Sequence, residues 1–140
     1  MKAVPEITVL CCGRTLEPGF YPREGWAEDG GRRVRFIRIS CGVAIEPRHL
    51  VRLFENGADG ILVVTCAREA CQSLFGTSCA AGRIRYTQGL LEEVGLGAGR
   101  LLLVAGDGLT AAGLAALTAE AAAAFARLGP SPVKSPAGAR

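Results

Sequence analysis

The chain has 140 residues and a mass of 14.6 kDa, enough for one domain with its own core. Apolar residues make up 49% and charged residues 21%, which is typical of globular and not of disordered proteins. The 16 basic and 13 acidic residues leave a net charge of +3, too small for the phosphate neutralisation of a dedicated nucleic-acid-binding protein. The composition therefore predicts one globular domain without a nucleic-acid partner.

Neither a secretory signal nor a membrane span is predicted. Pro5 and Glu6 interrupt the N-terminal stretch, where a signal would need an apolar run and a cleavage site. The most apolar window, 101–119, is broken at 106–108 by Gly-Asp-Gly, which indicates a strand, a loop and a helix. We therefore expect a cytoplasmic location, where the six cysteines remain reduced and serve metal ligation or redox chemistry.

Four short runs of apolar and β-branched residues predict strands. In chain order these runs are Ile7–Leu10, Val34–Ser40, Gly60–Thr65 and Leu101–Ala105. The third run has no polar alternation, as expected for a strand buried on both faces of a parallel sheet. Residues 14–31, between the first two runs, are interrupted by prolines and glycines, which predicts a loop with or without a short helix.

Three stretches with apolar residues at helical spacing predict helices. They run from Pro47 to Asn56-Gly57, from about Arg83 to Val94, and over roughly 16 to 20 residues that end at Leu128. In the second helix we expect Ile84, Leu91 and Val94 to face the core and Gly95 to end the helix. After the third helix, Gly129-Pro130 marks the end of the regular structure.

Strands that alternate with helices predict an α/β fold: a mostly parallel sheet of about four strands with flanking helices, of the flavodoxin or Rossmann type. We expect a single domain over 1–130, followed by a tail, 131–140, that is disordered or bound by a partner. In such a sheet the ligand crevice lies at the carboxyl ends of the strands. The fold class thus predicts where a functional site is to be sought.

Cysteines follow three of the predicted strands: Cys11 and Cys12 the first, Cys41 the second and Cys66 the third. Parallel strands bring these ends to one edge of the sheet, where thiolates hold an iron–sulfur cluster or a zinc ion. Because neighbouring residues on a strand point to opposite sides, we expect one member of the Cys11–Cys12 pair to face the site. Cys79 follows no strand and is interpreted as a small buried hydrophobic residue.

These residues resemble a known family. The order Cys11-Cys12, Cys41 and Cys66-x4-Cys71, the last pair after Gly-Ala-Asp-Gly-Ile-Leu-Val at 57–63, is similar to the delta subunit of methyl-viologen-reducing hydrogenase. The similarity runs from about Ile7 to Ala105. Two positions depart from the family pattern, because Thr15 replaces a third cysteine of C-C-x-x-C and Gln72 replaces a histidine.

The resemblance implies an electron-transfer subunit with no bond chemistry of its own. It implies one [2Fe-2S] cluster that relays electrons between a heterodisulfide-reductase-A-like flavoprotein, which would carry FAD, and a further redox subunit such as a hydrogenase, a formate dehydrogenase or an anaerobic reductase. The residues it assigns to the cluster are Cys11, Cys12, Cys41, Cys66 and Cys71. Backbone N–H groups at Gly13 and Gly42 are expected either to tune the cluster or simply to permit turns.

Two other functions fit the same cysteines. One is a thiol–disulfide or redox-sensing protein in which Cys11-Cys12 or Cys66-Cys71 forms a disulfide, although no C-x-x-C motif is present. The other is an interaction module that zinc stabilises. Separately, the arginines around Phe20, Tyr21 and Trp26 form either an ordinary solvated surface or a docking face for a partner.

Overall fold

A computed structural model gives the fold of the chain and describes residues 5–20, 22–29, 31–39, 45–66 and 76–132. Its strands are β1 (Glu6–Cys12), β2 (Gly25–Asp29), β3 (Arg32–Ile39), β4 (Gly60–Cys66) and β5 (Leu101–Gly106). Its helices are α1 (Pro47–Glu55), α2 (Gly76–Glu93) and α3 (Ala111–Leu128), with short 3-10 turns η1 (Gly13–Thr15) and η4 (Ala98–Arg100).

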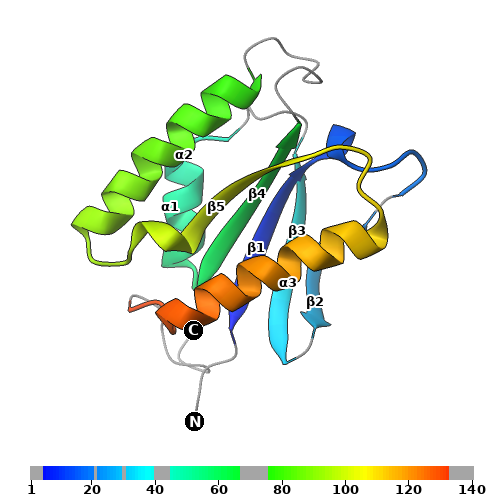
Figure 1. Cartoon of the computed structure of the whole chain (residues 1–140). Helices are drawn as coiled ribbons and strands as arrows, with labels where there is room; N and C mark the ends of the chain where they lie inside the picture. Colours follow the sequence, from blue (N-terminus) through cyan, green and yellow to red (C-terminus); the bar gives the residue numbers. More distant parts are fainter. Residues whose placement is uncertain (1–4, 21, 30, 40–44, 67–75, 133–140) are drawn as a thin grey trace.

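The five strands form one sheet in the order β2-β3-β1-β4-β5, in which only β2 runs antiparallel to its neighbour. Helices α1 and α2 cover one face, and α3 crosses the other (Figure 1). Each face carries a hydrophobic core: Phe54 and Ile84 lie in the first core, and Leu114 and Phe125 lie in the second. The expected α/β fold is confirmed, and the carboxyl ends of β1, β3 and β4 lie at one edge (Figure 1).

The expectation of a loop throughout 14–31 is wrong, because β2 lies there and makes the sheet five-stranded. Asp29 pairs with Arg32, so β2 and β3 form an antiparallel hairpin. Two strand-like runs separated by two glycines are a hairpin signal, since glycine tolerates the positive φ of such turns, and Gly31 has φ +84°. Pro18 and Pro22, which precede β2, favoured the prediction of a loop over that of a hairpin.

The second helix also differs from its prediction. Helix α2 begins at Gly76 and not at about Arg83, so Cys79, which lies before the predicted start, belongs to the helix. Ile84 and Leu91 are buried as predicted, but Val94 is 68% exposed because α2 ends at Glu93. Gly95 ends the helix in the expected way, with φ +84°.

β4, like β1, is buried at every one of its residues. The strand passes close under α3 at Gly60, where an added Cβ would lie 2.2 Å from the ring of Phe125. By contrast, β5 is an edge strand, and its middle residues are only partly buried. The predicted burial of the run Gly60–Thr65 on both faces is therefore confirmed.

At the amino ends of the strands, the buried Arg100 holds the end of α3 to the sheet. Its guanidinium donates to the carbonyls of Leu96, Asp59, Leu128, Gly129 and Pro130 at 2.8–3.2 Å. Burial lowers the pKa of Arg100, and the charge of Asp59 opposes that effect. The carboxylate of Asp59 accepts from the backbone N–H groups of Glu6 and Ser131, each at 2.8 Å. Ser131, the first residue of the predicted tail, is thus buried against the domain.

α3 is long and apolar enough to cross a membrane by length and composition alone. In the structure it packs on the sheet instead, with Leu114, Ala121 and Phe125 buried in the second core. Its first turn is capped by the hydroxyl of Thr110, which accepts from the N–H of Gly113 at 3.0 Å.

We expect Arg100→Met to lower the free energy of unfolding by about 3 kcal/mol, since several buried carbonyls would lose a charged donor. Arg127→Met is the matched control, because Arg127 lies exposed in the last turn of α3, the helix whose end Arg100 contacts, and its loss should cost about 0.5 kcal/mol or less. Urea denaturation of both variants measures the difference. Equal losses would show that Arg100 does not anchor the helix.

Candidate metal centre

The candidate site lies at the carboxyl ends of β1 and β4. The thiols of Cys12 and Cys66, the last residues of these strands, lie with their sulfur atoms 3.6 Å apart. Both side chains are buried, with 3% and 4% of their surface exposed. Residues 54 positions apart in the chain are therefore adjacent because parallel strands deliver their ends to one edge.

Cys11 lies apart from this pair. It is fully buried in the core on the α3 side, and its sulfur lies 3.1 Å from the hydroxyl of Thr15. That hydroxyl donates its hydrogen to the carbonyl of Cys12 at 2.7 Å. Toward Cys11 it can therefore act only as an acceptor, and the Cys11 thiol is the donor. The expectation that one of the two adjacent cysteines faces the site fits this geometry, in which Cys12 is the one beside Cys66.

The surroundings of Cys11 also act on the protonation of its thiol. Burial raises the pKa of the Cys11 thiol, and the neighbouring Cys12 adds to that effect. The Thr15 hydrogen bond and the positive charge of Arg38 act in the opposite direction, but burial outweighs them. A neutral thiol that donates to Thr15 is the form that these surroundings favour.

The loop after β5 forms one wall beside the cysteine edge. The N–H of Leu109 donates to the carbonyl of Thr15 at 2.8 Å, and the N–H of Glu17 donates back to the carbonyl of Leu109 at 2.9 Å. An added Cβ on Gly106 would lie 2.8–3.2 Å from Leu109, Val64 and Thr15, so glycine permits this close packing. The interpretation of Gly106-Asp107-Gly108 as a loop that serves packing fits these contacts.

The remaining candidates are placed as follows. Cys41 and Cys71 lie outside the described residues, and so does Gly42. Among the residues that the structure describes, no group of three or more possible metal ligands gathers. His49, on α1, is exposed and lies 4.0 Å from the carboxylate of Glu46. The described part of the site is therefore the Cys12–Cys66 pair.

The predicted docking face is only partly described, since Tyr21 lies outside the described residues. Trp26 on β2 is 44% exposed, and the guanidinium groups of Arg33 and Arg35 lie 4.4 and 5.6 Å from its ring centre. Arg33 also pairs with Glu6 at 3.2 Å. The arginines and the indole thus form an exposed cation–π cluster on the outer strands.

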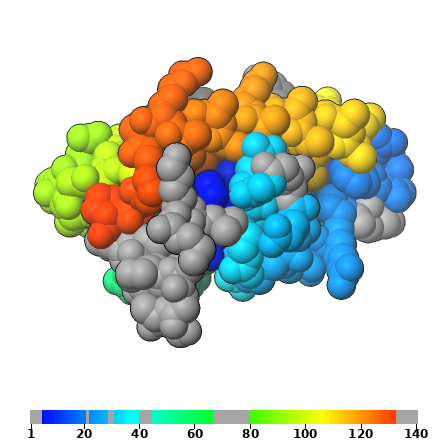
Figure 2. Space-filling model, turned by 90° about the horizontal axis from the view of Figure 1, so that it is seen from below, coloured from blue at the N-terminus to red at the C-terminus, as the bar shows by residue number. Residues whose placement is uncertain are grey.

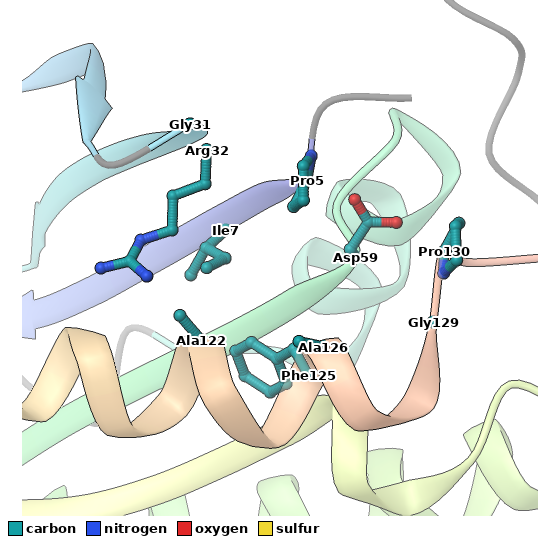
Figure 3. Close-up of a pocket in the computed structure, with 10 residues that line it drawn as sticks. All are labelled: Pro5, Ile7, Gly31, Arg32, Asp59, Ala122, Phe125, Ala126, Gly129 and Pro130. Carbon is teal, nitrogen blue, oxygen red and sulfur yellow. The ribbon is translucent and has the colours of Figure 1, made fainter. Parts of the chain in front are cut away.

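A cavity of about 420 Å³ lies at the opposite edge of the sheet, beside the amino ends of β1, β3 and β4. Figure 3 shows Ile7 and Arg32 on one side of it and Phe125 of α3 on the other. Figure 2 looks onto this edge, where the start of β1 lies recessed between α3 and β3. The cavity is separated from the cysteines by the length of the strands, so it is not part of their site.

The sequence is similar to one known protein family and to several of its members. Residues 7–129 match the family described as methyl-viologen-reducing hydrogenase, delta subunit. The chain belongs to this family. It is 30% identical over 101 residues, 72% of its length and 75% of the relative's, to the vhu iron-sulfur subunit of the F420-non-reducing hydrogenase of Methanocaldococcus jannaschii. It is 31% identical over 97 residues, 69% of its length and 71% of the relative's, to the iron-sulfur subunit of the F420-non-reducing hydrogenase of Archaeoglobus profundus.

A second kind of relative is much longer. The chain is 32% identical over 68 residues to the A-type polypeptide of the ferredoxin:CoB-CoM heterodisulfide reductase of Methanosarcina mazei. This match covers 49% of the chain but only 9% of that polypeptide. A segment similar to half of this delta-subunit chain therefore occurs inside a larger reductase protein.

Sequence reasoning missed Thr15 as a functional residue and noted it only as a departure from the family pattern. A hydroxyl four residues after Cys11 is within reach once the chain turns at η1. We expect Thr15→Val to lower the free energy of unfolding by about 1–3 kcal/mol, because the Cys12 carbonyl and the Cys11 thiol would each lose the hydrogen bond that they make with Thr15.

Thr118→Val is the control for this change. Thr118 is also buried, and its hydroxyl donates only to the carbonyl of Leu114 one helical turn earlier. Its loss should change the free energy of unfolding by about 0.5 kcal/mol or less. Denaturant titration distinguishes the variants, and a Thr15→Val protein as stable as Thr118→Val would contradict the role given to the hydroxyl.

Proposed function

We propose that this delta-family chain is an electron-transfer subunit that carries one [2Fe-2S] cluster. It relays electrons one at a time between a heterodisulfide-reductase-A-like flavoprotein and a further redox subunit. The observation that carries this proposal is the Cys12–Cys66 pair, with sulfur atoms 3.6 Å apart at the carboxyl edge of the sheet. The names of the hydrogenase relatives, which call them iron-sulfur subunits, support the iron–sulfur assignment.

The thiol geometry fits a shared metal ion. A tetrahedral ion bound to thiolates at about 2.3 Å sets two sulfur atoms ~3.8 Å apart. The observed separation of 3.6 Å is close to that value and far from the bonding distance of about 2.04 Å in a disulfide. Cys12 and Cys66 thus need little movement to bind one metal ion together.

A [2Fe-2S] cluster needs four ligands, and the proposal takes the other two from Cys41 and Cys71. Cys41 is two positions beyond Ile39, the last residue of β3, and Cys71 is five positions beyond Cys66. β3 and β4 are the two neighbours of β1 in the sheet. Both residues therefore follow strands that end beside Cys12, whereas the sulfur of Cys11 is engaged with Thr15.

When bound, the cluster supplies a site that accepts and releases one electron. The chain's own residues would bind it through thiolates, and Cys66 itself is only 4% exposed. Each electron that arrives from a reduced flavin leaves to the next redox centre, so no bond forms or breaks on this chain. The proposal therefore assigns it no catalytic residue.

The partner assignment draws on the longer relatives. A large reductase polypeptide that contains a segment similar to this chain suggests that the delta-type domain works beside such a protein, where FAD would be held. The proposal also includes a hydrogenase, formate dehydrogenase or anaerobic reductase as the other redox partner, and a cytoplasmic location. Reduced thiols suit that compartment.

The first test is the metal content of the chain purified without oxygen. We expect about two irons and two acid-labile sulfides per chain, with no paramagnetic signal when oxidised and a signal after dithionite reduction. Electron paramagnetic resonance and chemical analysis measure both. Bound zinc without iron would support the interaction module, and a metal-free protein that cycles between dithiol and disulfide would support the thiol–disulfide function.

The second test assigns the ligands. Cys12→Ser and Cys66→Ser should each lose most of the iron, because a neutral hydroxyl replaces a thiolate ligand. Cys11→Ser is the matched control, since it changes the neighbouring residue but leaves the pair intact, and it should keep its iron. Iron retained in Cys66→Ser, or lost only in Cys11→Ser, would contradict this assignment.

A further inference from the structure

The side chain of Arg38 lies over the chain directly after Cys12. An added Cβ on Gly13 would lie 2.5 Å from its Nε atom and 2.8 Å from its Nη2 atom. The guanidinium is therefore in contact with the backbone that follows a proposed cluster ligand. Arg38 reaches this point from β3, where it pairs with Cys11 in the register of the two strands.

The glycine at position 13 has no conformational explanation. Its φ lies outside the left-handed region, so the turn after β1 does not itself require glycine. An added Cβ at position 13 would meet the guanidinium, which would have to shift. Gly13 thus leaves room for the guanidinium to lie against the backbone.

The position of Arg38 is supported by its neighbours. Its backbone N–H donates to the carboxylate of Glu24 at 2.9 Å, which ties β3 to the segment before β2. This hydrogen bond holds the backbone of β3 at the position from which the Arg38 side chain reaches Gly13.

We propose that Arg38 raises the reduction potential of the centre held at Cys12 and Cys66. Gly13, which has no side chain, leaves the space in which the guanidinium lies beside this centre. The inference rests on the proposed function, since it concerns the same cluster. Reduction by one electron from a flavin donor adds one negative charge to a site already surrounded by thiolates. A fixed positive charge beside it stabilises the reduced form and so raises the potential.

The experiment is a mediated redox titration of the full chain with its cluster, followed by electron paramagnetic resonance. Arg38→Gln should shift the one-electron equilibrium about fivefold toward the oxidised form, which at 59 mV per decade is a fall of about 40 mV. Arg38→Lys keeps the charge and should retain most of the potential. Arg35→Gln is the charge-matched control, because Arg35 lies on the same strand but over Trp26.

Gly13→Ala provides an independent variant, because it displaces the guanidinium without removing the charge. It should lower the potential in the same direction, and adding it to Arg38→Gln should give little further change. Iron and sulfide content must match the parent chain in every variant.

Equal shifts in Arg38→Gln and Arg35→Gln would show a net-charge effect and would overturn the inference, as would unchanged potentials with the cluster present. Additive shifts in the double variant would likewise overturn the link between Gly13 and Arg38. Absence of iron from the parent chain would instead refute the proposed function itself, so the two failures are distinguishable.

Discussion

The arrangement of the domain depends on the contacts around Arg100 and Asp59 at the amino edge of the sheet. The last carbonyls of a helix have no partners within it, and the guanidinium of Arg100 satisfies the carbonyl of Leu128 at the end of α3 and those of Gly129 and Pro130 directly after it. Asp59, directly before β4, joins the start of β1 to the segment after α3 through Glu6 and Ser131. These contacts hold the start of β1, the start of β4 and the end of α3 together at the amino edge of the sheet. The two hydrophobic cores then fix the direction of the strands.

The positions of the strand starts at the amino edge determine where the strands end at the carboxyl edge. β1 and β4 are parallel and in continuous register from Ile7 opposite Gly60 to Cys11 opposite Val64. Strands that start together and have similar lengths end together, so Cys12 and Cys66 meet without any local device that brings them together. The strand ends thus bring the two thiols together, while the turn at η1 and the loop around Leu109 shape their surroundings.

Much of this was predictable because it follows from long-range periodicity. The apolar run at Gly60–Cys66 and the helical spacing that ends at Leu128 predicted the parallel frame, and the frame predicted the meeting of cysteines. The hairpin partner β2 was missed because Trp26 and its neighbours are polar or exposed, so the run has little apolar alternation. The different roles of Cys11 and Cys12 could not be predicted either, since they depend on where the Thr15 hydroxyl lies after the turn.

The packing also bears on which chemistry the cysteine pair suits. A disulfide would require the sulfur atoms of Cys12 and Cys66 to approach from 3.6 Å to about 2.04 Å, at the ends of strands held in a close-packed core. A shared metal centre needs almost no such movement, and one-electron exchange leaves the ligand positions nearly unchanged. Because β4 is buried along its whole length, the repeated movement of Cys66 that a disulfide cycle needs would disturb the packing. Fixed positions of the two sulfur atoms would not disturb it. The rigidity that the fold gives to this edge therefore favours holding a centre over cycling a disulfide.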